Sequence, residues 1–392
     1  MPLDFNQIST VLNKIVGDVT GQNPALGSYR TTKDFVAAAD IALSLGTDPI
    51  MKSISNMIGR TIMSVRPYDP ATALVEMDTL RYGNAVRKIT PIFVSGAEDQ
   101  PMYDSQPADG YSTDQWTIKR PQALETHFVN FSQWEVQAPT VFEDQLRAAF
   151  TGPEQLSEFM AAQMTAVNNE INSETEALAH GCICNLIAGK AMRNSADIRH
   201  VLTEYNTATG QSIASADVLF QPTYFEPFVK WFFAYIADIS DLMTKRSAKY
   251  HEGITGYTIL RHTPKRDQRL LVYSFLLRAI KTMALSGIYN DDLLKMDVTA
   301  PVEYWLSMAD RQKVMVDCSY TAADGTTATG GATVNPVIAV LFDRDAMGCN
   351  INLEASNVSP LNAKGRYYNQ FYHFTRRYFN DITENCVVFV LD

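Results

Sequence analysis

The C-terminal stretch from Pro336 to Asp392 reads PVIAVLFDRDAMGCNINLEASNVSPLNAKGRYYNQFYHFTRRYFNDITENCVVFVLD, and it decides the fold. An apolar run, Val337–Phe342, begins it, and a second run, Cys386–Leu391, ends it. Both runs are short, rich in β-branched residues and bounded by Asp, Asn or Pro, a pattern typical of buried strands. Chain ends are loose by default, so a chain that ends in a buried strand fixes its terminus in a sheet.

Three pieces of this stretch resemble the C-terminal end of major capsid proteins of tailed bacteriophages of the Hong Kong 97 type, especially those of small short-tailed phages. The pieces are AVLFDRDAMG, NAKGRYYNQFYHF and RYFNDITENCVVF. The resemblance continues upstream through VLTEYNTATG (201–210), SAKYHEG (247–253) and GTDPIMKSISNMIGRT (46–61), so it covers most of the chain. It implies an α+β capsid fold with an N-terminal arm, an extended β-hairpin loop, a long spine helix, a peripheral domain and an axial domain.

Composition and charge restrict the class of protein. Of the 392 residues, 46% are hydrophobic and 19% are charged, a balance that indicates folded domains rather than intrinsic disorder. The net charge of −10 disfavours a DNA-binding module, because such modules carry a basic face for the phosphates. An acidic protein can still enclose DNA without adhering to it.

The chain shows no secretory leader and no stretch of about 18 apolar residues that could span a bilayer. We therefore expect synthesis in a reducing cytosol, no membrane association and free thiols at all five cysteines, which are Cys182, Cys184, Cys318, Cys349 and Cys386.

The N-terminal part is predicted to form an arm, residues 1–60, that holds short helices over 32–45 and 49–58. Extended runs follow at 61–66, 86–94, 116–119 and 127–136. The polar insertion at 95–114 fits either a projecting hairpin or a surface loop. The resemblance favours the hairpin, and assigns residues 61–125 to the extended loop.

A long helix is predicted from Pro153 to about residue 184. Its apolar residues recur three, four or seven positions apart and keep one narrow stripe facing inward: Leu156, Met160, Met164, Val167, Ile171, Leu178 and Cys182. About thirty residues without a breaker far exceed the ordinary helix of ~11 residues, which indicates a structural spine.

Two further helices, over about 223–245 and 267–284, and strands at 256–261 and 313–318 predict a separate α/β unit. The small-residue segment 321–335 is predicted to be an exposed loop. By the resemblance, residues 211–336 form the axial domain, and residues 126–210 and 337–392 form the peripheral domain.

The clearest candidate for a metal site is the group His180, Cys182 and Cys184. On a helix, Cys182 points away from the other two, and no second pair lies nearby, so ordinary helix packing is favoured over a structural zinc site. Asp343 and Asp345 fit turn and cap positions, and the basic cluster from Arg261 to Arg266 fits a solvated loop or a subunit contact. The motifs of phosphate loops, serine hydrolases and zinc peptidases are missing from the sequence, and we expect no catalytic, cofactor-binding or metal-binding residues.

The resemblance therefore implies a structural protein rather than an enzyme: a major capsid protein of the virion, assembled in the host bacterial cytoplasm. Its expected partners are other copies of itself in hexamers and pentamers, the portal, scaffolding or decoration proteins, and packaged double-stranded DNA in non-specific proximity. The predicted intersubunit contacts are Tyr103, Trp116, Arg376, Arg377 and Tyr378, since arginine and aromatic residues are enriched at interfaces. The open alternatives are an encapsulin-like shell with an enzyme cargo, a cytosolic enzyme and a nucleic-acid-binding virion protein.

Overall fold

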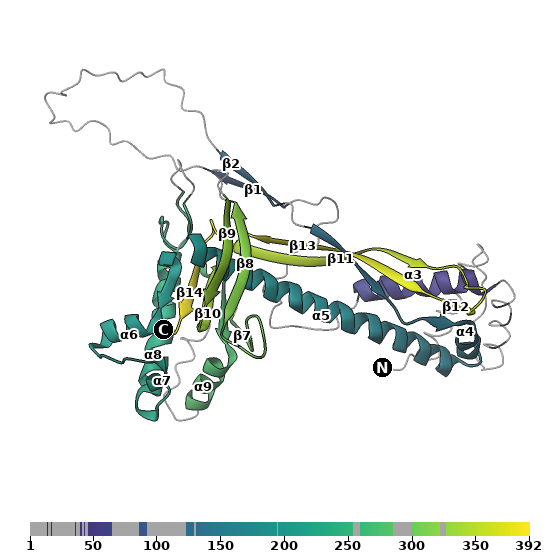
Figure 1. Ribbon diagram of the computed structural model, residues 1–392, viewed down its shortest axis with the longest axis horizontal. Helices are drawn as coiled ribbons and strands as arrows, with labels where there is room; N and C mark the ends of the chain where they lie inside the picture. The colour runs from purple at the N-terminus through teal and green to yellow at the C-terminus, as the bar shows by residue number, and fades with distance from the viewer. Residues whose placement is uncertain are drawn as a thin grey trace, which may run out of the picture. The chain divides into compact units, whose positions relative to one another are not determined.

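In a computed structural model of the protein, the residues described are 14, 17, 36, 40, 43, 46–64, 86–91, 123–128, 131–193, 195–253, 259–284, 299–321 and 327–392. The chain divides into two compact units. Unit 1 comprises 1–82, 131–179 and 349–378, and unit 2 comprises 83–130, 180–348 and 379–392. Figure 1 labels the elements.

Unit 1 combines a three-stranded sheet with helices. The sheet has the order β11 (Met347–Val358), β13 (Gln370–Asn380) and β3 (Phe131–Gln137), and a short pair joins β4 (Val141–Phe142) to β12 (Tyr367–Tyr368). Its helices are α3 (Thr47–Ser64), α4 (Glu143–Ala149) and the first part of α5 (Pro153–Arg193). The side chains of Ile50 and Met51 on α3 share one core with Leu156 on α5 and Tyr372 on β13.

The long helix α5 is present, and at 41 residues it continues beyond the predicted end near residue 184. Pro153 and Glu154 suit its first turn, and Lys190 and Arg193 suit its last. The predicted stripe is confirmed in unit 1, where Leu156, Met160 and Val167 are buried. From Cys182 to Lys190 almost every side chain is buried, so this end of the helix lies inside the core of unit 2.

Unit 2 is built on a five-stranded mixed sheet of order β5-β14-β10-β6-β7. The two C-terminal apolar runs form its centre: β10 (Val337–Asp343) and β14 (Cys386–Val390) pair antiparallel and are buried at every position. This confirms the prediction of buried strands. β14 pairs parallel with β5 (Ile198–His200), and β10 pairs antiparallel with β6 (Gln268–Tyr273), which pairs parallel with β7 (Thr299–Val302).

Helices pack on this sheet to form the core of unit 2. They are α6 (Val201–Thr209), α7 (Ala216–Leu219), α8 (Pro222–Met243) and α9 (Ser274–Ala284), with short 3-10 turns at Ser195–Asp197, Lys265–Asp267 and Arg344–Ala346. Phe232 of α8 meets Phe389 of β14 edge to face at 5.8 Å between ring centroids. Helix α8 confirms the helix predicted over 223–245.

Two antiparallel ribbons complete unit 2. β1 (Val86–Pro91) pairs with β2 (Ala123–Phe128), and β8 (Val314–Thr321) pairs with β9 (Thr327–Val334). Residues 92–122, which contain the predicted tip of the extended loop, lie outside the described residues. The same holds for the predicted strand at 116–119 and for most of the predicted arm.

Four predictions of local structure are wrong. Residues 61–64 continue helix α3 through Gly59 instead of starting a strand. Residues 268–273 form strand β6 instead of the start of a helix, because they pair with both β10 and β7. Much of the expected loop 321–335 is strand β9. The single strand expected over 127–136 is divided between β2 and β3.

The predicted domain boundaries also differ from the compact units. Residues 337–392 were expected to belong entirely with 126–210, but β10 and β14 share a sheet with β6 and β7 of the predicted axial segment. The unit boundary falls within α5, β11 and β13, so each of these elements contributes to both units. The names peripheral and axial remain predictions.

Candidate assembly surfaces

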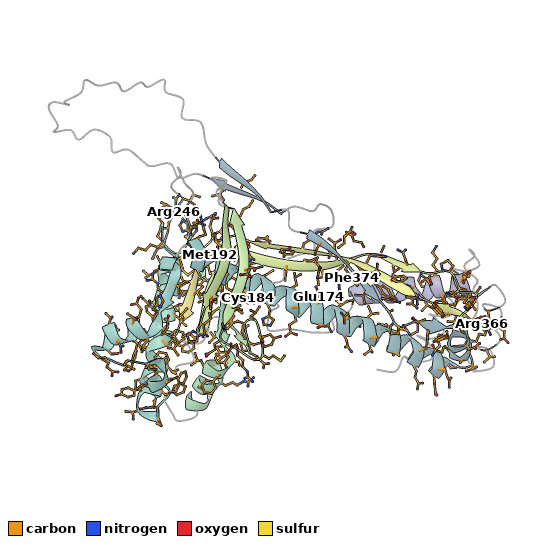
Figure 2. All side chains as sticks on the ribbon, viewed as in Figure 1. Glu174, Cys184, Met192, Arg246, Arg366 and Phe374 are labelled. Atoms are coloured by element: carbon orange, nitrogen blue, oxygen red, sulfur yellow. The ribbon has the colours of Figure 1, made fainter. Side chains whose placement is uncertain are left out.

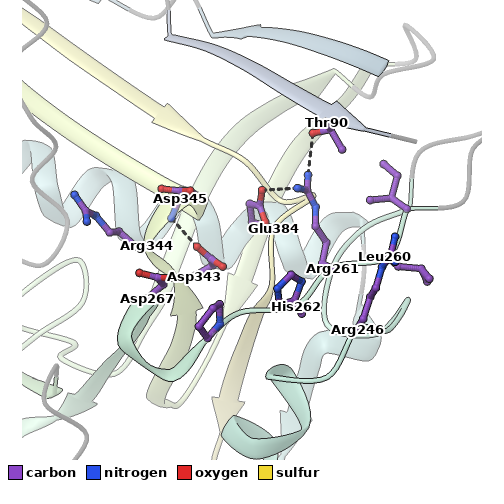
Figure 3. Close-up of a pocket in the computed structure, with 12 residues that line it drawn as sticks. Thr90, Arg246, Leu260, Arg261, His262, Asp267, Asp343, Arg344, Asp345 and Glu384 are labelled. Atoms are coloured by element: carbon purple, nitrogen blue, oxygen red, sulfur yellow. Dashed lines mark hydrogen bonds and ion pairs between the residues drawn. The ribbon is translucent and has the colours of Figure 1, made fainter. Parts of the chain in front are cut away.

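An ion cluster binds the base of the β1–β2 ribbon to the rest of unit 2. Its centre is Lys88 on β1, whose Nζ lies 2.8 Å from Asp381 Oδ2 and also pairs with Glu384. Arg261 NH1 lies 2.9 Å from Glu384 Oε1, and the same guanidinium donates to Thr90 Oγ1 of β1 at 3.2 Å (Figure 3). In the described sheets, β1 and β2 pair only with each other. The ion pairs therefore hold this ribbon to the rest of unit 2, and solvent screens them little because Asp381 and Glu384 are nearly buried.

The pKa values of the two acids in this cluster shift in opposite directions, although burial acts on both in the same way. Burial alone would raise the pKa of Asp381, but the charge and hydrogen bond of Lys88 and two donors on Thr383 hold it below its ordinary value. Burial raises the pKa of Glu384 despite the neighbouring cations Lys88 and Arg261. Because the pKa of Asp381 is lowered on folding, its contribution to stability is present above about pH 4 and is lost as the pH falls further.

Beside this cluster lies a cleft of about 580 Å³ whose lining includes several charged side chains. Arg246, His262 and Arg344 line it together with Asp267 and Asp345 (Figure 3). Opposite charges therefore face the same space, and no single ligand charge is selected.

A second buried acid of this cleft besides Glu384 is Asp343, whose carboxylate oxygens accept structural hydrogen bonds. Its Oδ2 accepts from Thr263 Oγ1 at 2.5 Å, and its Oδ1 accepts from the Asp345 amide at 2.9 Å. Burial raises the pKa of Asp343. The residue ends β10 and its side chain caps the following 3-10 turn, which confirms the predicted cap role.

His180, Cys182 and Cys184 do not converge on a common point. His180 Nδ1 lies 3.0 Å from the carbonyl oxygen of Trp305, and Cys184 Sγ donates to the same oxygen at 3.2 Å (Figure 2 labels Cys184 on α5). Within the described parts of the chain, no group of three His, Cys, Asp or Glu side chains is placed to hold a metal ion. The pair therefore anchors the loop at Trp305.

The buried cysteines should be chemically inert in the folded protein. Burial raises the pKa of Cys184 and of Cys386 to about 12, and Cys182 and Cys349 are also buried. At pH 8 a thiol of that pKa is a thiolate only about once in 10⁴ molecules, and the thiolate is the reactive form. We expect these four cysteines to resist iodoacetamide for hours in native protein and to react within minutes in denaturant, as measured by mass spectrometry. Rapid native labelling of Cys184 would contradict the structure.

A second ion cluster stabilises unit 1 around Glu143, at the start of α4. Arg147 NH2 lies 2.8 Å from its Oε1, and Arg366 NH2 lies 2.9 Å from its Oε2. The hydrogen bonds from Arg147 and Arg366 lower the pKa of Glu143. This cluster connects α4 to the turn before β12, since the Glu143 amide also donates to the Arg366 carbonyl oxygen at 2.9 Å.

A pH-dependent stability of α4 follows from the lowered pKa of Glu143. The contribution is present above the unfolded pKa, near 4.3, and is lost as the pH falls through the lower folded value. We expect hydrogen-exchange protection of α4 to fall between about pH 5 and pH 3 in the wild type, and to be lower and nearly constant over that range in Glu143→Gln. Glu154→Gln, at an exposed acid in the first turn of α5, is the control and should retain the wild-type profile. An unchanged profile in Glu143→Gln would refute the assignment.

The predicted contact residues on β13 lie in different environments. Arg376 donates to Ser132 Oγ at 3.0 Å and pairs with Glu174 of α5, so its charge is used within its own subunit. Arg377 is buried, and Tyr378 is half-buried. Tyr103 and Trp116 lie outside the described residues. The structure thus brings the three β13 residues onto one strand, and their intersubunit role remains a prediction.

Lys190, which is completely buried near the end of α5, was not predicted as a structural residue from the sequence. Its Nζ lies 2.8 Å from Asp197 Oδ2 and donates to the carbonyl oxygens of Tyr250 at 3.2 Å and Glu384 at 3.4 Å. This lysine connects α5, the segment before β5 and the segment before β14. A lysine among apolar residues near the end of a helix can indicate a buried charge. The partners of Lys190 could not be deduced from the spacing of residues in the sequence.

The described ion clusters join segments that lie far apart in the sequence. The chain belongs to the Phi29-like phage major capsid protein family, whose family model matches residues 12–390. The predicted class is therefore confirmed: the protein is a phage major capsid protein, a subunit of the homo-oligomeric shell of the virion. That family implies a structural rather than an enzymatic role, and it disfavours the encapsulin-like alternative.

Several solved structures are similar to the chain at low identity. The capsid structure of Staphylococcus phage Andhra is 13% identical, with 82% of this chain and 83% of that chain covered and a TM-score of 0.49. The asymmetric unit of the bacteriophage PhiM1 mature capsid is 9% identical, with coverage of 83% and 87% and a TM-score of 0.40. A virus-like particle from Pyrococcus furiosus is 8% identical, with coverage of 85% and 98% and a TM-score of 0.38.

No curated protein matches the sequence. Among the described helices, none combines the length and the apolar character that crossing a lipid bilayer requires.

Proposed function

We propose that the subunits form hexamers and pentamers, and that these close into an icosahedral shell around the double-stranded DNA genome of a tailed phage. Assembly takes place in the host cytoplasm, with the portal and scaffolding or decoration proteins as further partners. Rings of five or six copies require heterologous contacts that close by rotation. The net charge of −10 suits a wall that encloses DNA without gripping its phosphates.

The observation that supports this proposal most strongly is the fixed base of the β1–β2 ribbon. A two-stranded ribbon is marginally stable alone, yet here Lys88 and Thr90 bind it to the buried acids and Arg261. Between those two residues, Ile89 is on the opposite face and is 58% exposed. A ribbon with a fixed base and an exposed isoleucine is suited to reach a neighbouring subunit.

We assign residues 61–125 to the extended loop, with Tyr103 and Trp116 as contacts on the adjacent subunit. We assign residues 131–179 and 349–378 of unit 1 to the peripheral domain, and the five-stranded sheet of unit 2, with its helices, to the axial domain. These boundaries follow the compact units instead of the segments 126–210 with 337–392 and 211–336 that the sequence indicated.

Cryo-electron microscopy of purified particles tests the proposal. We expect closed shells with both fivefold and sixfold capsomers, and density for each ribbon that extends over an adjacent subunit. Small discrete oligomers without these symmetries, or a ribbon folded onto its own subunit in the particle, would overturn it.

A further inference from the structure

An exposed aromatic cluster lies where α7, α8 and α9 meet in unit 2. Phe220, Phe225 and Phe275 contact one another, with ring centroids 5.8 to 6.4 Å apart. Phe220 is 41% exposed and Phe275 is 53% exposed. Three rings that pack together at the surface form a contiguous apolar patch, and such a patch indicates a binding surface more strongly than scattered apolar residues do.

Ion pairs of balanced charge accompany this aromatic cluster. Glu226, next to Phe225, pairs with Lys230 at 2.7 Å, and Arg278, one turn after Phe275, pairs with Glu303 at 3.1 Å. An aromatic centre with a polar rim is the usual anatomy of a protein interface. Because each rim pair is neutral overall, the surface does not select a phosphate-rich partner.

Unit 2 presents a second apolar surface on the loop between β7 and β8. Leu306 is 43% exposed and Met308 is 73% exposed, whereas Trp305 between β7 and Leu306 is completely buried. Trp305 Nε1 donates to the Val337 carbonyl oxygen at 2.9 Å, and the Trp305 amide donates to the Arg311 carbonyl oxygen at 3.0 Å. With His180 and Cys184 also on the Trp305 carbonyl oxygen, this loop is held rigid, so little entropy is lost when it is covered.

We propose that the aromatic cluster of one subunit packs against the Leu306–Met308 loop of the next subunit around a capsomer. This inference rests on the proposed function, because a ring of five or six copies needs two different patches on each subunit. A single self-complementary patch would produce twofold dimers instead. In Figure 1, α7 and the loop that follows β7 lie on opposite sides of α9, as a head-to-tail contact requires. Methionine adapts well to aromatic surfaces, since its thioether is flexible and polarisable.

Cross-linking between two variants, each with one added surface cysteine and the four buried native ones, tests this contact. Phe275→Cys and Met308→Cys, each in a Cys318→Ser background, are mixed, assembled and treated with a short bismaleimide. A cross-link between the two variants can form only between subunits. We expect a heterotypic dimer band in assembled particles, with the 275–308 link identified by mass spectrometry, and at most a tenth as much product from either variant alone.

The outcomes separate this inference from the proposed function. If particles form but only homotypic cross-links or none appear, the assigned contact is wrong and the capsomer proposal stands. If the unmodified chain forms no rings or shells under any condition, the proposed function itself fails.

Charge substitutions provide a second test with a matched control. Phe275→Glu should lower the yield of particles at least tenfold, because it places a carboxylate in the covered apolar centre. Leu242→Glu is the control, since Leu242 is 45% exposed on α8 outside the cluster, and it should leave the yield within twofold. Circular dichroism of both variants verifies folding. Equal loss of particles in the two variants would overturn the inference.

Discussion

Replacement of Lys190 by Met should destabilise unit 2 by about 3–5 kcal/mol, because it leaves the carboxylate of Asp197 buried without its ammonium partner. Lys190 is 0% exposed and Asp197 is 3% exposed, so water cannot solvate the Asp197 carboxylate in place of the lost ammonium group. The carbonyl oxygens of Tyr250 and Glu384 would lose the same donor. Hydrogen exchange measured by mass spectrometry on β10 and β14 peptides would report the loss within unit 2, where a global unfolding midpoint would mix the two units.

The double variant Lys190→Met, Asp197→Leu is the matched control. Replacing a buried ion pair by apolar residues of similar volume is often neutral, so most of the lost protection should return. Protection that stays at the level of the single variant in the double variant would show that packing, and not the buried charge, determines the effect.

The second large effect is expected at Lys88, where Lys88→Glu would place a third acid beside Asp381 and Glu384. Since Lys88 is 18% exposed and both acids are nearly buried, we expect a cost of about 3 kcal/mol, at the lower end for broken buried pairs. The protection of β1 and β2 against hydrogen exchange should fall at least tenfold, and the yield of particles should fall with it. The exchange of β10 and β14 should stay near wild type, because these strands have their own ladder.

Lys52→Glu, at an exposed position on α3, makes the same charge change in unit 1 and serves as the control. It should leave both the exchange of the ribbon and particle yield unchanged. If the ribbon keeps its protection in Lys88→Glu, the ion cluster does not hold it, and the proposed rigid base of the extended loop must be abandoned.

The elements that were predicted correctly are those with a strong and unambiguous pattern. The two C-terminal runs are too short and too β-branched for helices, and the stripe of α5 repeats over many turns without a breaker. The resemblance in the C-terminal motifs then identified the family before any fold was known. These features are local, so a single sequence is sufficient to show them.

The wrong predictions lie where long-range pairing decides the structure. The run QRLLVYSFLL has apolar residues at both helical and strand spacing, and only the ladders with β10 and β7 make its first part a strand. The small residues of TATGGATV show no hydrophobic period, yet they pair residue by residue with β8. Gly59 resembled a helix stop, but the helix continues through it to Ser64.

The ion clusters were not predictable for the same reason. Lys88 and Asp381 are 293 positions apart, and no spacing rule connects them. The basic sequence around Arg261 predicts a solvated loop or a subunit contact, but the Arg261 side chain binds Glu384 and Thr90 instead. Burial, which the sequence does not show directly, determines which charges act structurally.

Sedimentation velocity of the purified protein tests the central claim, that the chain takes its stable form in an assembly of many copies. We predict rings of five or six subunits and larger shells, with particles that grow at the expense of the 43.7 kDa subunit as concentration rises. A single well-folded 43.7 kDa species at every concentration and salt condition tested would contradict the account.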